Sequence, residues 1–249
     1  MAERIVSVHE KASGTLELAL SGGLSFCIDA TDARLCGLSL EAASTANTAD
    51  IADTADRPGT VHRILVLPDQ SGALLAQGQL LDDHVAALLS QMDQVHRAKA
   101  SALSIAARSE QGTRQLHEKL IQRGFEPHTA RLVTAWMYEK RYIDDRRYAN
   151  LMIRAHMVRK GQGLARIKAL LWPRIGLFET PRQILDDVLK ALEPETFMTA
   201  IRRSADRFLK KAGSDAVHLE SRLRAWLKKE GFPSSAIEQF MSEWEAHGD

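Results

Sequence analysis

The stretch LHEKLIQRGFEPHTA, residues 116–130, specifies two helices and the turn between them. Leu116 and Leu120 are four residues apart, so their side chains lie on one face of a helix. Gly124 follows after another four residues, where a glycine readily ends a helix, and EPHTA offers a polar start for the next one. The stretch therefore predicts an amphipathic helix, a glycine C-cap and a second helix.

The same plan occurs twice more along the chain. LRAWLKKEGFPSSAI, residues 223–237, repeats the spacing of Leu, Leu, Gly and Phe. IKALLWPRIGLFETP, residues 167–181, has one extra residue before Gly176 and carries Pro173 within its first helix, which is therefore expected to be bent or shortened. One helix pair cannot bury both of its apolar stripes, so the copies are expected to stack or to pair with further helices. Four tryptophans at helical positions in or beside the copies are expected to pack within or between them: Trp136, Trp172, Trp226 and Trp244.

Residues 1–78 have a different pattern, which predicts a small β-rich region. RIVSVHE alternates apolar and polar residues, and VHRILVLP is a short apolar run stopped by proline. TLELALSGGLSFCIDA contains two such runs separated by Ser-Gly-Gly, a hairpin signal. AASTANTADIADTADRPG, residues 42–59, has few bulky apolar residues and is expected to form a mobile loop.

The period changes near Leu80, where the spacing of apolar residues becomes helical. A long helix capped by Asp82 or Asp83 and ending near Arg108 is predicted, as a linking helix within residues 79–110. The remainder, residues 111–249, contains the three copies and is expected to be entirely helical. The chain is therefore predicted to be mainly α, with the β-rich region at its N-terminus.

The formal charge is divided in a similar way. Residues 1–96 hold 5 Lys/Arg and 13 Asp/Glu, a charge of −8, whereas residues 97–249 hold 28 and 19, a charge of +9. Such a division indicates two parts with different surfaces. The basic part suits a polyanion or an acidic protein as its partner.

YIDDRRYA, residues 142–149, places two acids directly before two arginines. Asp144 and Asp145 either form a catalytic or metal-binding pair or begin a helix. No third ligand lies at a suitable spacing, so the helix start is favoured. Asp144 would then accept hydrogen bonds from free backbone N–H groups, and Asp145 in the first turn would favour the positive end of the helix dipole.

These elements together resemble the RecX family of recombinase regulators. The match consists of LHEKLIQRGF, a helix, YIDDRRYA, a basic helix and GQGLARI at the start of the second copy, and it covers about residues 100–245. The resemblance implies three tandem three-helix repeats and a role in binding and restraining RecA. The sequence departs from the family at Gly112, where a serine is common, at the extra residue and proline of the second copy, and in its longer acidic N-terminal region.

A run of basic residues follows the helix start and is the predicted partner surface: Arg146, Arg147, Arg154, Arg159, Lys160, Arg166 and Lys168. Taken alone, such a run is also consistent with a solvated helix face. The positive surplus of this half and the resemblance to RecX favour contacts with the RecA–DNA filament. The expected effect is to modulate, and on balance inhibit, ATP hydrolysis and strand exchange by RecA, and so recombinational repair.

The alternative is a helical-repeat protein that binds DNA directly. A helix that reads base sequence offers Arg, Asn or Gln in its first turn. The second helices here begin EPHTA, FETPR and PSSAI, which are poor in those residues. This composition favours the RecX-like interpretation, with DNA as a further, direct partner.

The sequence offers no recognisable catalytic or cofactor site. KGQGLAR lacks the Lys-Ser/Thr of a phosphate-binding loop, the nine histidines are dispersed, and no Gly-x-Ser-x-Gly elbow is present. Cys27 and Cys36 are expected to be free thiols. No apolar run approaches the ~20 residues that span a bilayer, and the start of the chain lacks the features of a secretory signal. We expect a cytoplasmic, non-enzymatic monomer without metal, cofactor or membrane contact.

Overall fold

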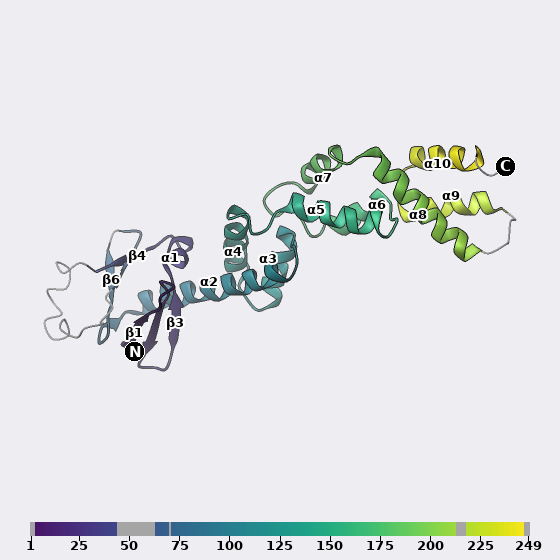
Figure 1. Ribbon diagram of the computed structural model, residues 1–249. Coiled ribbons are helices and arrows are strands. Elements are labelled where there is room, and N and C mark those ends of the chain that lie inside the picture. Colours follow the sequence, from purple (N-terminus) through teal and green to yellow (C-terminus); the bar gives the residue numbers. More distant parts are fainter. Residues whose placement is uncertain (1–2, 44–62, 70, 213–217, 247–249) are drawn as a thin grey trace. The chain divides into compact units, whose positions relative to one another are not determined.

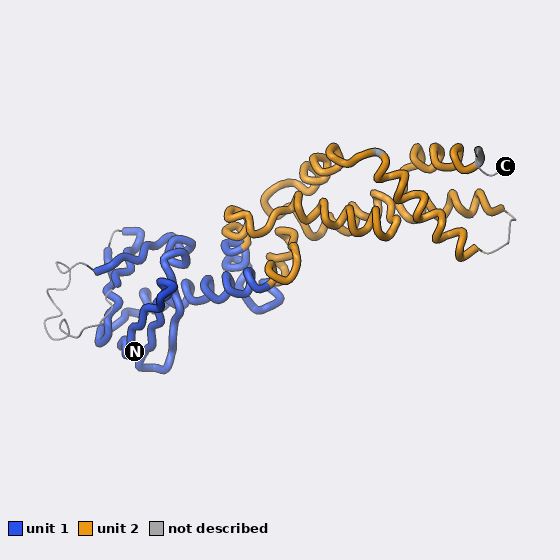
Figure 2. The backbone as a smooth tube through the Cα atoms, in the orientation of Figure 1, with its two compact units in different colours: residues 1–104, 120–133 blue, residues 105–119, 134–249 orange. Residues whose placement is uncertain are grey.

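The computed structural model describes residues 3–43, 63–69, 71–212 and 218–246. Most of the loop predicted over residues 42–59 lies outside these ranges. The chain divides into two compact units, residues 1–104 with 120–133, and residues 105–119 with 134–249 (Figure 2). The described part is mainly helical and has its strands near the N-terminus, as the sequence predicts (Figure 1).

The first unit contains two antiparallel sheets. The larger sheet has the order β3-β2-β1-β7 and the smaller one the order β4-β5-β6. The predicted Ser-Gly-Gly hairpin joins β2 to β3, and Gly23 has the positive φ of 85° that this turn requires. The strands are β1 (Glu3–Glu10), β2 (Leu16–Leu20), β3 (Ser25–Ile28), β4 (Ser39–Ala42), β5 (Arg63–Val66), β6 (Gly72–Leu75) and β7 (Leu80–Leu81).

Two helices complete this unit. The short helix α1 (Ala30–Leu35), which the sequence pattern did not indicate, begins at Asp29 with a capping box. The long helix α2 (Asp83–Arg108) ends where the sequence predicts, and the Asp82 carboxylate accepts a hydrogen bond from the Val85 N–H at 2.7 Å. Val85, Leu89 and Met92 of α2 are buried with apolar residues of the strands, so this helix supplies one wall of the β-rich core.

The rest of the chain is helical. The helices are α3 (Thr113–Gln122), α4 (Pro127–Glu139), α5 (Asp145–Ile153), the π-helical turn η2 (Arg154–Val158), α6 (Leu164–Leu171), α7 (Pro181–Lys190), α8 (Pro194–Ala212), α9 (Leu219–Glu230) and α10 (Ser234–Ala246). Helix α6 ends two residues before Pro173, which confirms that proline shortens it. The helices from α5 onward share one core that includes Ile167, Leu171, Leu223 and Leu227, all fully buried.

The glycine C-caps are present in the first and third copies. The Phe125 N–H donates to the Leu120 carbonyl at 3.2 Å, and the Phe232 N–H donates to the Leu227 carbonyl at 3.2 Å. Gly124 and Gly231 have positive φ values, which is the backbone conformation that this cap requires. The three tandem three-helix repeats stay a prediction. The described helices form two consecutive sets of three, α3–α5 and α6–α8, and the third set has only α9 and α10 within the described residues.

Three of the four tryptophans pack as expected. Trp226 and Trp244 contact the apolar core, and the ring of Trp136 lies 5.5 Å from that of Tyr142. The prediction is wrong for Trp172, whose surface is 50% exposed. Because α6 ends before Pro173, Trp172 stands just beyond the last turn of the helix and outside its buried stripe.

Candidate partner-binding surface

Asp144 is the N-cap of α5, as the sequence predicts. One oxygen of its carboxylate, Oδ1, accepts hydrogen bonds from the backbone N–H groups of Arg146 at 2.8 Å and Arg147 at 3.0 Å. These two groups have no partner within the helix, because the first turn of a helix leaves its N–H groups free. Asp144 therefore has a local, structural role.

Replacing Asp144 by alanine is expected to lower the free energy of unfolding by ~0.5–2 kcal/mol through loss of this cap. Asp144→Asn is expected to be nearly silent, because a single amide oxygen can accept both bonds that Oδ1 accepts now. Urea unfolding of the two variants measures the difference. Equal loss of stability in both variants would contradict a pure capping role.

Asp145 stands in the first turn of α5, as the sequence predicts, and has a further role that the sequence did not indicate. Its side chain is buried, with 3% of the residue exposed. Its carboxylate accepts three hydrogen bonds, from the Thr113 N–H and hydroxyl, each at 2.7 Å, and from the Gly176 N–H at 2.8 Å. Burial raises the pKa of Asp145, and these donors oppose the rise. Asp145 thus joins the starts of α3 and α5 to the segment that follows α6.

Gly112 explains one departure from the RecX pattern. A Cβ at this position would lie 2.2 Å from the carbonyl oxygen of Arg174, closer than any real contact. The Arg174 carbonyl oxygen also accepts a hydrogen bond from the Gln115 N–H, in the first turn of α3, at 3.0 Å. The close backbone approach therefore selects glycine over serine at residue 112.

Two of the predicted basic residues bind acidic groups of their own unit. The Arg146 guanidinium lies 2.9 Å from the Glu179 carboxylate and 2.7 Å from that of Asp187. Arg147 lies 2.7 Å from the Glu110 carboxylate. Arg146 therefore connects α5 to α7, and both arginines are held as parts of the fold.

The other five predicted basic residues, Arg154, Arg159, Lys160, Arg166 and Lys168, lie beyond the regular part of α5. The helix widens into the π-helical turn η2, in which the Arg159 N–H donates to the Arg154 carbonyl at 3.3 Å. The wider turn rotates the residues beyond it, and such turns are frequent at functional sites. Arg166, on α6, pairs with the Glu230 carboxylate at 3.1 Å.

Four predicted cations remain available to a partner. Within the described part of the chain, no ion pair or side-chain hydrogen bond occupies Arg154, Arg159, Lys160 or Lys168. The first three are exposed and Lys168 is half-buried. The sequence predicted these four residues together with Arg146 and Arg147. Only the structure shows that Arg146 and Arg147 are held in ion pairs within the fold.

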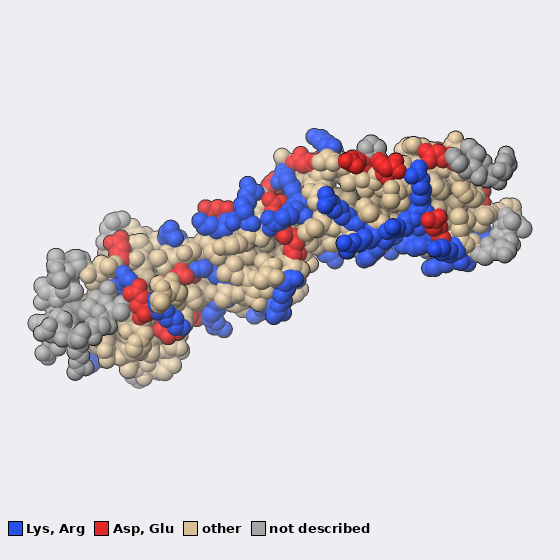
Figure 3. All heavy atoms as spheres, in the orientation of Figure 1, with Lys and Arg blue, Asp and Glu red and all other residues tan. Residues whose placement is uncertain are grey.

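Helix α8 adds cations that the sequence analysis did not include. The Arg203 guanidinium donates to the Arg159 carbonyl at 3.2 Å, and that of Arg207 donates to the Gly161 carbonyl at 3.2 Å. Figure 3 shows Lys and Arg gathered over the region of α6, α8 and α9. The basic surface, as the term is used below, comprises Arg154, Arg159, Lys160, Arg166, Lys168, Arg203 and Arg207.

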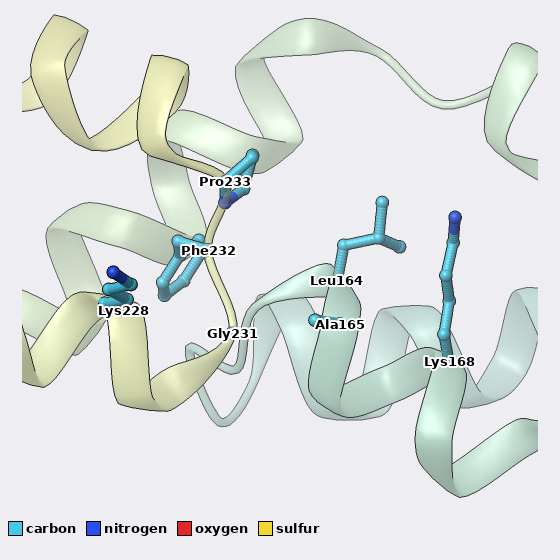
Figure 4. Close-up of a pocket in the computed structure, with 7 residues that line it drawn as sticks. All are labelled: Leu164, Ala165, Lys168, Lys228, Gly231, Phe232 and Pro233. Atoms are coloured by element: carbon cyan, nitrogen blue, oxygen red, sulfur yellow. The ribbon is translucent and has the colours of Figure 1, made fainter.

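Two hollows open beside the basic surface. One, of ≈ 450 Å³, is lined by Arg154 and Arg159 together with the segment that leads into α8. The other, of ≈ 260 Å³, lies between α6 and the turn from α9 to α10 (Figure 4). Both are shallow surface features, and Lys168 lines the second.

The first unit contains a cluster of possible metal ligands. Asp29, Asp32 and His96 present oxygen and nitrogen atoms within 4.8 Å of one another. The Lys99 ammonium already lies 2.9 Å from the Asp29 carboxylate and 2.8 Å from that of Asp32. Burial raises the pKa of Asp32, and the ammonium opposes this. The cluster is therefore an ion-pair network that ties α1 to α2.

A membrane span is not among the described elements. Even the longest described helices are too polar to cross a bilayer.

The chain is similar to several RecX proteins. It is 25% identical to the regulatory protein RecX of Clostridium tetani over 158 residues, which cover 62% of this chain and 70% of that protein. It is 28% identical to RecX of Vibrio parahaemolyticus over 116 residues, 45% of this chain and 69% of the relative. It is 30% identical to RecX of Halorhodospira halophila over 138 residues, 55% of this chain and 81% of the relative. The sequence matches no family model.

Solved structures show the same fold. A crystal structure of regulatory protein RecX matches with a TM-score of 0.62 at 16% identity, covering 96% of this chain and 99% of that one. A crystal structure of RecX from Lactobacillus salivarius matches with a TM-score of 0.54 at 16% identity, covering 62% of this chain and 98% of that one.

Proposed function

The chain belongs to the RecX family of regulatory proteins, and on that premise we propose that it binds the RecA–DNA filament through its basic surface and restrains RecA. The observation that carries this proposal is a set of exposed cations beside arginines of α8. Arg154, Arg159 and Lys160 have no ion pair or side-chain hydrogen bond to any residue that the structure describes. Charges that are unused within the fold are free to neutralise phosphates or exposed carboxylates.

The proposed mechanism is steric and electrostatic and involves no bond chemistry. Each contact of an exposed cation is individually weak and screened by salt. A filament repeats the same sites along its length, so several weak contacts act together once one has formed. A protein held in this way would hinder the movements that RecA needs for ATP hydrolysis and strand exchange.

Reversing the charge of the three free cations tests the proposal. The variant Arg154→Glu, Arg159→Glu, Lys160→Glu is expected to lose most inhibition of the RecA ATPase, because three attractive contacts become repulsive. It should keep its fold, since the side chains are exposed and unpaired within the described residues. Inhibition is measured at two salt concentrations, with circular dichroism and thermal melting as fold controls.

A matched control carries the same change of charge elsewhere. Lys140, Arg182 and Lys190 are exposed and lie outside the basic surface. Their triple reversal to glutamate is expected to leave inhibition close to that of the parent. If the folded variant of the basic surface inhibits as well as this control at both salt concentrations, the surface is only a solvated face and the proposal is wrong.

A second candidate function is direct DNA binding, which the same surface favours by its charge. For contacts to phosphates, losing each cation should lower the salt dependence of binding to bare DNA by ≈ 1 in the logarithmic slope. Titration of bare DNA with the parent and the two triple variants therefore measures the share of DNA contacts. Strong binding to bare DNA, with no added affinity for the RecA filament, would favour this second function.

A further inference from the structure

The hollow between α6 and the turn from α9 to α10 has a floor of tightly joined backbone. The Gly163 N–H donates to the Glu230 carbonyl at 2.8 Å, and the Ala165 N–H donates to the Gly231 carbonyl at 3.0 Å. A Cβ on Gly163 would lie 2.2 Å from the Gly231 carbonyl carbon, so the two glycines allow an approach that other residues would prevent. The hollow is therefore preformed and held by the fold.

Its walls are apolar and its edges are basic. Leu164 and Ala165 of α6 face Phe232 and Pro233 across the hollow (Figure 4). Lys168 and Lys228 stand on its two sides, on α6 and α9. Within the described ranges, neither ammonium has an ion pair or side-chain hydrogen bond to another residue. An apolar centre between two unused positive charges is the complement of an apolar side chain flanked by carboxylates.

The size of the hollow favours a side chain over a small molecule. Its ≈ 260 Å³ lies below the ~300–1,000 Å³ of typical ligand pockets, and it is open to solvent. Anchoring of one large apolar or aromatic side chain is the usual way in which such small, preformed hollows contribute to protein interfaces.

A nucleic acid fits this hollow less well. Base stacking inside the hollow would need an exposed aromatic face in its lining, and the lining residue Phe232 is only 5% exposed. Trp172, four residues beyond Lys168, is 50% exposed, and tryptophan is among the residues most enriched at the centres of protein interfaces. A protein is therefore the favoured occupant.

We propose that this hollow, the α6–α9 pocket, receives a segment of a partner protein in which one large apolar side chain is flanked by acidic residues. Lys168 and Lys228 pair with the flanking carboxylates, and Trp172 contacts the segment beyond the pocket. This inference rests on the proposed function for the identity of the partner, an exposed segment of RecA in the filament. The basic surface attracts the filament by charge in general, and the α6–α9 pocket adds one specific contact with a protein side chain.

Filling the pocket from within tests the inference. Ala165 is exposed and lines the pocket, so Ala165→Phe places a ring where the partner's side chain would sit. Ala169, one turn further along α6, is also exposed and does not line the pocket, so Ala169→Phe is the matched control. Affinity for RecA filaments on single-stranded DNA should fall about tenfold or more in Ala165→Phe and stay unchanged in Ala169→Phe.

Reversing the charges of the two lysines at the edges of the pocket tests whether acidic residues flank the partner's apolar side chain. Lys168→Glu with Lys228→Glu is expected to weaken filament binding about tenfold, because two attractions become repulsions. The control is Lys229→Glu, at an exposed neighbour that does not line the pocket. A synthetic labelled peptide with one phenylalanine between two pairs of aspartates serves as a second probe, which is independent of RecA.

The outcomes separate this inference from the proposed function. If the parent binds filaments and Ala165→Phe binds as tightly, the pocket inference is wrong and the proposed function stands. If the parent does not bind filaments, the proposed function fails, and the peptide decides the inference: binding to the parent but not to Ala165→Phe supports it, and no binding overturns it. If Ala165→Phe weakens binding to bare DNA as much as binding to filaments, the occupant is nucleic acid and the inference is overturned.

Discussion

Replacing Asp145 by alanine is expected to lower the free energy of unfolding by about 3 kcal/mol, more than any other single change at the start of α5. The carboxylate accepts from Thr113 twice and from Gly176 once, and all three donors lose their partner when it is removed. An unpaired buried donor costs ~1–3 kcal/mol, and the relief from burying the carboxylate offsets part of the sum. Denaturant unfolding followed by circular dichroism measures the loss.

The two neighbouring aspartates should respond differently to asparagine. At residue 145 both oxygens accept, Oδ1 from the Thr113 N–H and Oδ2 from its hydroxyl and from the Gly176 N–H. An amide has one acceptor and turns an NH2 group toward a donor, so Asp145→Asn should lose ~1–3 kcal/mol. At residue 144 only Oδ1 accepts the capping bonds, and Asp144→Asn should be nearly silent. Equal stabilities for the two asparagine variants would contradict this assignment.

The second large effect is expected at Lys99. Its ammonium lies 2.8 Å from the Asp32 carboxylate, which is fully buried. Lys99→Met keeps the volume of the side chain and removes the charge, which leaves the buried Asp32 carboxylate with His96 at 2.8 Å and the Asp29 N–H at 2.8 Å but without its ammonium partner. Breaking a buried pair from one side typically costs ~3–5 kcal/mol, and we expect a loss in that range by thermal or denaturant unfolding.

Two comparisons identify the cause of that loss. In Lys99→Met with Asp32→Asn the buried charge is absent, so this double variant should be more stable than Lys99→Met alone. Lys11 pairs with Glu17 at the surface, and Lys11→Met should change stability little, because solvent screens an exposed pair. A double variant that is no more stable than Lys99→Met would show that lost packing, not the unpaired charge, causes the effect.

The basic surface shows where sequence reasoning reached its limit. The run from Arg146 to Lys168 is visible in the sequence because charge is a property of each residue. Which of these charges are free depends on where Glu179, Asp187, Glu110 and Glu230 come to lie. Those partners stand between 33 and 64 residues away along the chain. Spacing in the sequence carries no signal for such pairs. Tertiary packing brings them together: α5 packs against α7 for Arg146, and α6 lies against the end of α9 for Arg166.

By itself, the sequence determined the local elements of this protein. The repeated spacing of leucine and glycine, the cap at Asp144, the hairpin at Ser-Gly-Gly and the end of α6 before Pro173 all depend on residues within about one or two turns of one another. Only the tertiary structure decided the role of Asp145, the pairing of Lys99 with Asp29 and Asp32, and the contact of Gly163 with Gly231. The physical reason is that helix periodicity and capping act over a few residues, whereas a buried polar group finds its partner only when packing brings distant backbone and side chains into contact.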